Sequence, residues 1–224
     1  MHIIHETQNI VAIATCKSAN RKTGKSVQIW ILSKNMHPHD SRTTGEDAKN
    51  QCKGCDFASY NGCYVITPTL AALWRSYQDG KYTYLNVGTK AWDKFFRGEY
   101  VRLGAYGNPS KLPLSMVESI CGLARRHTGY FHDWHLMSAK QAKGYGRFFM
   151  ASTSATNQAR AKALGLRTFT TGGGEIEKGL QCPAYTHDMQ CGECGLCDGT
   201  FRRDTLPDVW INPHGYQTKK AQAC

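Results

Sequence analysis

The chain has 224 residues, a formal net charge of +11 and a hydrophobic fraction of 41%. This length fits one domain, or one domain with an appendage, and is sufficient for a sizeable hydrophobic core. No apolar run approaches the roughly 18 residues of a membrane helix, and the N-terminal residues lack the basic and apolar regions of a secretory signal, so we expect a cytoplasmic protein with no membrane partner.

The positive charge is distributed along the chain, and no block reaches five like charges. Its short basic clusters are Arg21, Lys22 and Lys25; Arg125 and Arg126; Arg202 and Arg203; and Lys219 and Lys220. Two interpretations follow: a solvated basic surface, or an extended face that contacts the phosphates of a nucleic acid. Charge alone does not decide between them.

The N-terminal part offers one clear element. Residues 1–26 are predicted to be irregular apart from the short apolar run Ile10–Ala14, whereas Val27–Leu32 has the β-branched and aromatic composition of a strand. His37 and His39 follow. On an extended segment both imidazoles would point to one side as ligands, and the alternative is that they are loop surface.

A polar loop then carries three cysteines, Cys52, Cys55 and Cys63, with Tyr64 directly after the last. Three thiolates are one short of a closed tetrahedral site. A cluster held by three cysteines would leave one iron open to a small molecule. The alternatives are that one of the three belongs to a second site, or that Cys55 or Cys63 is an ordinary buried thiol.

The middle of the chain alternates helices and strands. Helices are predicted over Thr67–Gln78, around Trp92, Phe95 and Phe96, and over Leu114–Arg126 and Ser154–Leu164; strands are predicted over Tyr100–Ala105, Gly129–Trp134, Arg147–Ala151, Leu166–Thr171 and, at an edge, Asp208–Ile211. Thr67 is the expected N-cap of the first helix, and basic residues occupy the last turn of the third. Strand–helix–strand repeats predict an α/β fold with a parallel sheet.

Polar side chains follow three of these strands. They are Asn108 after one strand, His132, Asp133 and His135 after the next, and Ser152, Thr153 and Ser154 after the third. Taken singly, each is best explained as a cap or loop residue. Together they form a polar rim at one end of a possible barrel, where a ligand is expected in folds of this kind.

Near the C-terminus four cysteines fall within sixteen residues: Cys182 before Pro183, then Cys191, Cys194 and Cys197 at a repeated spacing of three. The intervening glycines allow the backbone to wrap around a metal centre. The C-x2-C-x2-C run with a separate Cys-Pro favours an iron–sulfur cluster, with a zinc ion on four thiolates as the alternative. Disulfides or free thiols are the third interpretation.

We therefore divide the chain into a barrel-like α/β domain, residues 1–176, which includes the cysteine loop 52–63, and a cysteine-rich segment, residues 177–224, packed on it. The run Gly172–Gly174 before Glu175 is interpreted as a linker between them. The polar tail from Gln217 is expected to be loose, which argues against Cys224 as a ligand.

Four segments carry a resemblance to a known family. They are Cys52-x2-Cys55-x7-Cys63-Tyr64, Val101–Pro109, Met150–Ser152 with Ala163–Phe169, and Cys182-Pro183-Ala184 with Cys191-x2-Cys194-x2-Cys197. They resemble a family of phage- and plasmid-encoded proteins with an early cysteine group ending in Cys-Tyr, a Gly-Asp-Pro or Gly-Asn-Pro turn, and a late cysteine knot. The match covers about residues 18 to 200, and that family is similar to the radical S-adenosylmethionine (SAM) superfamily.

The resemblance implies a partial (β/α) barrel with one or two [4Fe–4S] clusters and SAM as co-substrate. The usual superfamily triad is C-x3-C-x2-C, whereas this chain has C-x2-C-x7-C. The triplet Gly173-Gly174-Glu175 resembles the segment that holds the methionine amino group in that superfamily. It follows a late strand instead of the second, so that role is not transferred.

Three functions are consistent with these observations. The first is a radical-SAM-like enzyme in which Cys52, Cys55 and Cys63 hold one cluster, the C-terminal cysteines hold a second cluster or zinc, and Asn108, His132, Asp133 and His135 bind the substrate. Its substrate would be a nucleotide or a DNA base, as in phage DNA modification in the host cytoplasm. The second is a non-catalytic protein that is stapled by metal and binds nucleic acid. The third is an iron–sulfur redox sensor.

Overall fold

A computed structural model of the chain describes residues 1–20, 23–172, 179–201 and 206–212. Its strands are β1 (His2–Glu6), β2 (Ile10–Asn20), β3 (Gly24–Ser33), β4 (Thr83–Tyr84), β5 (Tyr100–Tyr106), β6 (Arg126–Phe131), β7 (Met150–Thr153), β8 (Thr168–Thr171), β9 (Gly179–Gln181) and β10 (Asp208–Ile211). Its helices are α1 (Pro38–Thr43), α2 (Glu46–Lys49), α3 (Thr67–Gln78), α4 (Lys90–Phe96), α5 (Leu114–Leu123), α6 (Ala139–Gly146), α7 (Gln158–Ala163), α8 (Pro183–Thr186) and α9 (Cys191–Cys194), with 3₁₀ turns η1 (Pro109–Lys111) and η2 (Asp133–Leu136).

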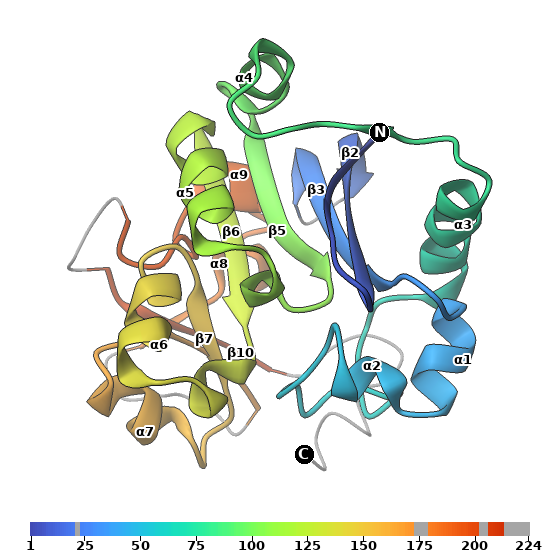
Figure 1. Cartoon of the computed structure of the whole chain (residues 1–224). Helices are drawn as coiled ribbons and strands as arrows, with labels where there is room; N and C mark the ends of the chain where they lie inside the picture. The colour runs from blue at the N-terminus through green and yellow to red at the C-terminus, as the bar shows by residue number, and fades with distance from the viewer. Residues whose placement is uncertain (21–22, 173–178, 202–205, 213–224) are drawn as a thin grey trace.

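These strands pair into one sheet in the order β4-β1-β2-β3-β5-β6-β7-β8-β10-β9 (Figure 1). From β3 to β9 every neighbouring pair is parallel. The prediction of an α/β fold with a mostly parallel sheet is therefore confirmed. β10 lies between β8 and β9, so the prediction that Asp208–Ile211 forms an edge strand is wrong.

The N-terminal strands correct the prediction that residues 1–26 are irregular. β1 and β2 pair antiparallel, and β2 pairs antiparallel with β3 in a register that places Val11 opposite Leu32. Ala12 and Ala14 pack into the larger core, whereas Val11 and Ile13 pack into the smaller one. A strand buried on both faces has a continuous apolar run instead of an alternating one. Here that run, Ile10–Ala14, is short and the residues after it are mostly polar, which is why the strand was not predicted.

Several predicted boundaries are also corrected. α5 ends at Leu123 and Arg126 already belongs to β6, so the basic residues are not in the last turn of that helix. Ile66, and not Thr67, is the N-cap of α3. β6 ends at Phe131, β7 starts at Met150 and α7 starts at Gln158, each shifted by a few residues from the prediction. Neither α6 nor β9 was predicted.

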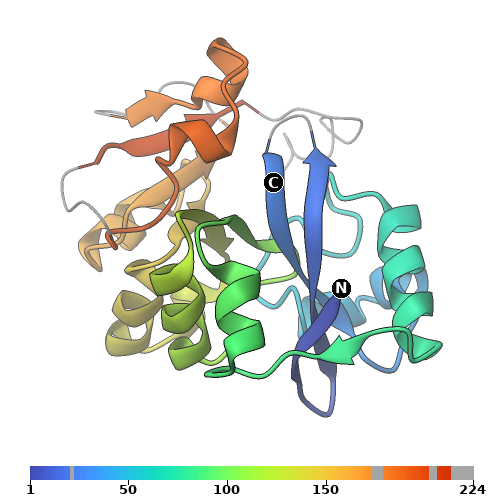
Figure 2. The same ribbon diagram turned by 90° about the horizontal axis from the view of Figure 1, so that it is seen from above.

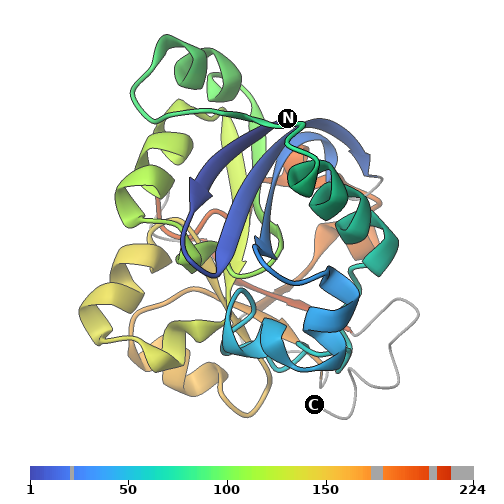
Figure 3. The ribbon, with the colours of Figure 1, turned by 45° about the vertical axis from the view of Figure 1, so that its right-hand side comes forward.

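Helices cover one face of the parallel strands. The larger core joins alternate residues of β5 and β6 to α4, α5, α6 and α7. The smaller core joins β1, β2 and β3 to α3 and to the cysteine loop, and Figure 3 shows α1, α2 and α3 on that side of the N-terminal strands. We call the sheet face opposite α5–α7 the inner face.

The C-terminal segment lies on the inner face. α9 lies against β3 and β6, and Figure 2 shows the orange and red segment across the sheet from the green and yellow helices. The division that we expected at residue 176 falls outside the described residues, as do Gly173-Gly174-Glu175 and the tail with Cys224. Among the described helices, none has the length and apolar character of a membrane span.

Candidate functional site

The cysteine loop follows β3, the first strand of the parallel part, and brings its three thiols together. Cys52 is 7% exposed within the smaller core, and Cys55 and Cys63 pack against the same cluster. Tight turns shape the loop, because Cys52 N–H donates to Asp47 O at 2.7 Å and Cys55 N–H donates to Cys52 O at 3.0 Å. Burial raises the pKa of all three thiols, and their proximity to one another raises the pKa of Cys52 and Cys55 further.

The Gly107-Asn108-Pro109 turn after β5 supports this loop. Asn108 N–H donates to Gln51 O at 2.7 Å, and the Asn108 side-chain amide donates to Lys53 O at 3.3 Å. Gly107 has a φ of +77°, and a Cβ there would lie 2.5 Å from the Ile31 carbonyl oxygen. Only glycine fits this approach of β5 to β3, so the turn that the sequence singled out is a structural support of the cysteine loop.

Two of the four rim residues that were predicted to bind the substrate have structural partners. Asn108 is fully buried, and besides Lys53 its side chain contacts the His132 N–H at 3.4 Å. Asp133 is 4% exposed and accepts hydrogen bonds from Ser110 Oγ at 2.6 Å and Lys111 Nζ at 2.9 Å. Asn108 and Asp133 therefore hold the loops in place.

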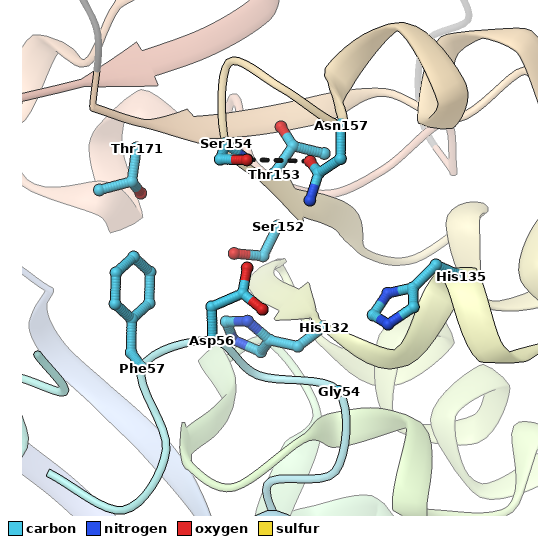
Figure 4. A pocket seen from close by; sticks show the side chains of 10 residues that line it. All are labelled: Gly54, Asp56, Phe57, His132, His135, Ser152, Thr153, Ser154, Asn157 and Thr171. Carbon is cyan, nitrogen blue, oxygen red and sulfur yellow. Dashed lines mark hydrogen bonds between the residues drawn. The ribbon is translucent and has the colours of Figure 1, made fainter. Parts of the chain in front are cut away.

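The other two, His132 and His135, line an open pocket at the carboxyl ends of β6, β7 and β8 (Figure 4). The pocket is a shallow hollow open to solvent, and its lining comprises Gly54, Asp56, Phe57, His132, His135, Ser152, Thr153, Ser154, Asn157 and Thr171. We call it the rim pocket. Asp56 and Phe57 extend from the cysteine loop toward Ser152 and Thr171, so the loop that carries the thiols also forms one wall.

The rim pocket is hydroxyl-rich and contains no lysine or arginine among its described lining residues. Burial lowers the pKa of His132 to about 4, although the nearby carboxylates of Asp133 and Asp56 oppose this shift. The His132 imidazole is therefore neutral at pH 7, and its ring can both donate and accept a hydrogen bond. This lining suits a neutral or cationic polar ligand better than a phosphate.

The four C-terminal cysteines line a second pocket on the inner face, of about 330 Å³, together with Tyr130 and other residues. Cys182 follows β9 directly, and Cys191 and Cys194 begin and end α9. Gly195 turns the chain with a φ of +65° and brings Cys197 to the same pocket. Burial raises the pKa of Cys191, Cys194 and Cys197, and the other thiols of the group raise each of them further.

Buried hydrogen-bond donors lie beside both groups. Arg42 is 1% exposed; its Nη1 donates to Val65 O at 2.7 Å, but its Nε and Nη2 have no partner among the described residues. The buried Tyr100 hydroxyl lies beside the Cys191 thiol, within reach of its sulfur. Unpaired buried donors are costly, and anionic sulfur within reach would satisfy them.

The donor set therefore fits a sulfur-ligated metal group in its chemistry. A bound metal ion would deprotonate the thiols despite their raised pKa values. Within the described residues, however, no three His, Cys, Asp or Glu side chains stand in positions to hold a single metal ion. A zinc ion requires all of its thiolates to lie about 2.3 Å from one metal atom. A cubane cluster is wider, so its thiolates can lie farther apart. The observed separation of the thiols therefore disfavours zinc more than it disfavours a cluster.

The other candidate ligands are the cysteines outside the two groups and the histidines His37 and His39. The nine described cysteines are free thiols, so none of them forms a disulfide; Cys16 and Cys121 belong to neither group. His37 caps α1 by accepting from His39 N–H at 3.3 Å, and His39 contacts the Tyr60 hydroxyl at 3.1 Å. The two histidines therefore lie at the start of α1 and not in a loop, and His39 is exposed.

No family model matches the chain, and neither the curated proteins nor the solved structures include a significant match. The resemblance to the radical-SAM superfamily therefore stays a prediction. Four residues that the fold places beside the thiols or in the rim pocket were not predicted from the sequence: Arg42, Phe57, Tyr100 and Arg102. Phe57 lies between Cys55 and Cys63, and Tyr100 and Arg102 share one face of the predicted strand Tyr100–Ala105; these were the available sequence signals, and Arg42 had none.

Proposed function

We propose that this chain is an iron–sulfur enzyme of the radical-SAM type that acts on a nucleotide or a DNA base. The observation that carries the proposal is the gathering of seven cysteines into two groups, one at the carboxyl ends of the parallel strands beside the rim pocket and one on the inner face. Ligands of parallel α/β folds bind at that end of the strands. The seven consecutive parallel strands support a partial (β/α) barrel, with residues 177–224 as a cysteine-rich segment packed on it.

The loop group is proposed to hold a [4Fe–4S] cluster through Cys52, Cys55 and Cys63. When bound, such a cluster supplies one-electron reduction of a ligand at its open iron. The residues of the chain have separate tasks: Phe57 offers an aromatic face to a base, Ser152 and Thr171 offer hydroxyls, and the neutral His132 orients the ligand. Among the described lining residues there is no lysine or arginine, which is compatible with the nucleoside part of SAM.

The C-terminal group is proposed to hold a second cluster through Cys182, Cys191, Cys194 and Cys197, with zinc as the alternative. Four thiolates complete the coordination of either group and leave no open position. This centre therefore fastens the C-terminal segment to the inner face, and it does not bind the substrate.

The experiment is a metal and sulfide analysis of the full chain purified without oxygen. We expect about four or about eight iron atoms per chain with matching acid-labile sulfide, a brown colour that fades in air, and SAM cleavage after addition of a reductant. Cys55→Ala should abolish SAM cleavage and lower the iron content. Cys16→Ala, which changes an exposed thiol outside both groups, should do neither. Colourless protein with zinc only, or with no metal, would contradict the proposal.

The net charge of +11 favours one second candidate, a non-catalytic nucleic-acid-binding protein stapled by metal. In that case the protein would bind DNA with an affinity that falls steeply with salt, and it would not cleave SAM with its metal in place. SAM cleavage by an iron-loaded chain would exclude it. An iron–sulfur sensor would likewise keep its cluster but leave SAM intact, and its redox state would change its affinity for a partner.

A further inference from the structure

Arg102 lies on the inner face, between the two cysteine groups. On β5, Val101 and Leu103 point into the core beneath α5, so the alternate residues Tyr100 and Arg102 point to the opposite face. Arg102 is only 9% exposed. Its position is fixed by a central strand that has a parallel neighbour on each side.

A continuous set of contacts joins Arg102 to the loop group. Its Nη2 donates a hydrogen bond to the Tyr64 hydroxyl, and its guanidinium carbon lies 6.0 Å from the centre of that ring. Tyr64 directly follows Cys63, and the positive charge of Arg102 is within electrostatic reach of the Cys63 sulfur.

A second set of contacts joins Arg102 to the C-terminal group. Tyr100, two residues earlier on the same face, packs against the backbone of Gly192, where a Cβ would lie 3.2 Å from the Tyr100 ring. Gly192 directly follows Cys191, and the Cys191 sulfur is also within electrostatic reach of Arg102. The charge of one guanidinium therefore acts on a thiol in each group.

No carboxylate forms an ion pair with Arg102 among the residues that the structure describes. A buried charge is costly unless an opposite charge or several hydrogen bonds offset it. Two other arginines each lie near only one cysteine group. Arg42 lies near Cys63 of the loop group. Arg126 contacts Gly195 and donates to Glu193 O in the C-terminal group.

We infer that Arg102 is a shared counter-charge that raises the reduction potential of both sulfur centres. This inference rests on the proposed function, because it requires an iron–sulfur centre in each group. Reduction adds one negative charge to a centre, and a nearby fixed cation stabilises the reduced form more than the oxidised form. Arg102 is a positioning and tuning residue here, and no bond to the substrate is assigned to it.

The test is an anaerobic redox titration of the full chain, followed by electron paramagnetic resonance, for wild type, Arg102→Gln, Arg42→Gln and Arg126→Gln. The Cys55→Ala variant identifies which signal belongs to the loop group. We expect Arg102→Gln to lower both midpoint potentials, Arg42→Gln to lower that of the loop group only, and Arg126→Gln to lower that of the C-terminal group only. Arg102→Lys, which keeps the charge, should stay closer to wild type in both.

A change in only one potential, or in neither, for Arg102→Gln would overturn the inference, as would equal effects of all three arginine variants on both centres. If Arg102→Gln does not fold by circular dichroism, Arg102→Met, which is also uncharged and keeps a long unbranched side chain, takes its place. No shift in either potential with Arg102→Met would then refute the inference. Wild-type protein with fewer than two iron–sulfur centres would also refute the inference. The iron and sulfide content of the wild-type protein then separates two cases: one cluster per chain leaves the proposed function standing, and no cluster refutes both.

Discussion

Single residues in this chain have roles that their chemical type alone does not reveal. Asn108, His132, Asp133 and His135 all follow strands of the parallel sheet, yet only the two histidines line the rim pocket. Asn108 and Asp133 are buried among backbone groups and the side chains of Ser110 and Lys111. A polar residue after a strand correctly predicts that the site lies at the carboxyl end of the sheet. Whether its side chain points into the site depends on which loop packs against it.

Gly54 shows how tightly the cysteine loop packs on the loop after β6. Its φ is +80°, and a Cβ there would lie 2.8 Å from the Asp133 Cα. Gly80, after α3, has a similar φ of +66° with nothing within 4 Å. Each Gly→Ala substitution should cost about 1–2 kcal/mol from the left-handed backbone, and Gly54→Ala should cost about 1–3 kcal/mol more from overpacking.

Urea denaturation of both variants without oxygen measures this difference in the free energy of unfolding. Gly54→Ala should also lower the iron content of the loop group, whereas Gly80→Ala should not. Equal costs for the two variants would show that the loop does not press on Asp133.

His132 should behave as a neutral imidazole throughout the physiological range. Because burial lowers its pKa from 6.5 to about 4, the unfolded chain binds this proton at a higher pH than the folded chain does. Its contribution to stability is therefore lost progressively as the pH falls from about 6.5 to about 4, and it is constant above 6.5. His132→Gln should remove this part of the pH dependence.

The measurement is an NMR titration of the histidine ring protons, with His132→Gln to assign the resonance. A His132 resonance that titrates near pH 6.5 would contradict the buried, neutral state and with it the hydrogen-bonding role proposed in the rim pocket.

Among the elements, those with helical periodicity or a long strand-forming run were predictable from the sequence. α3, β3 and β5 lie where periodicity and composition placed them. β2 was missed because its apolar run Ile10–Ala14 is short and the residues after it are mostly polar, and the three-residue β9 because its pairing with β10 depends on contacts made far along the chain. The cysteine spacing identified both groups of thiols, but no local pattern could place the second group on the inner face of the sheet.

Arg167 is the clearest anchor of the C-terminal segment to this sheet. It is 6% exposed just before β8; its Nη2 donates to Leu196 O and Pro207 O, each at 2.8 Å, and its Nη1 donates to Gly199 O. Arg167→Ala would leave these buried carbonyls unpaired and should lower the free energy of unfolding by about 3 kcal/mol or more. Limited proteolysis should then cleave the C-terminal segment preferentially.

The matched control is Arg97→Ala, which removes an exposed ion pair with Asp93 and should cost no more than about 0.5 kcal/mol. If Arg167→Ala were as stable as Arg97→Ala, the C-terminal segment would not depend on this anchor.

In the whole molecule, thiols that are far apart in sequence converge on one sheet. The loop group follows the first parallel strand and packs against Tyr106 of β5, whereas the C-terminal group follows β9 and lies beside Tyr100 of β5 and Tyr130 of β6. If metal binds only the folded chain, its binding free energy adds directly to stability. Metal removal should therefore destabilise the fold, and the two groups should contribute differently.

Three cysteine variants separate metal binding from packing. Cys194→Ala removes a ligand of the group that fastens the C-terminal segment, so it should greatly reduce the yield and melting temperature of folded protein. Cys55→Ala should leave the fold largely intact and remove only the metal of the loop group. Cys121→Ala changes a fully buried thiol of α5 outside both groups and should cost only about 1 kcal/mol of packing, with unchanged metal content.

A chelator should lower the melting temperature of wild type and Cys121→Ala toward that of Cys194→Ala. If the chelator changed neither protein, or if Cys55→Ala unfolded the whole chain, the assignment of one stapling centre and one reactive centre would be wrong.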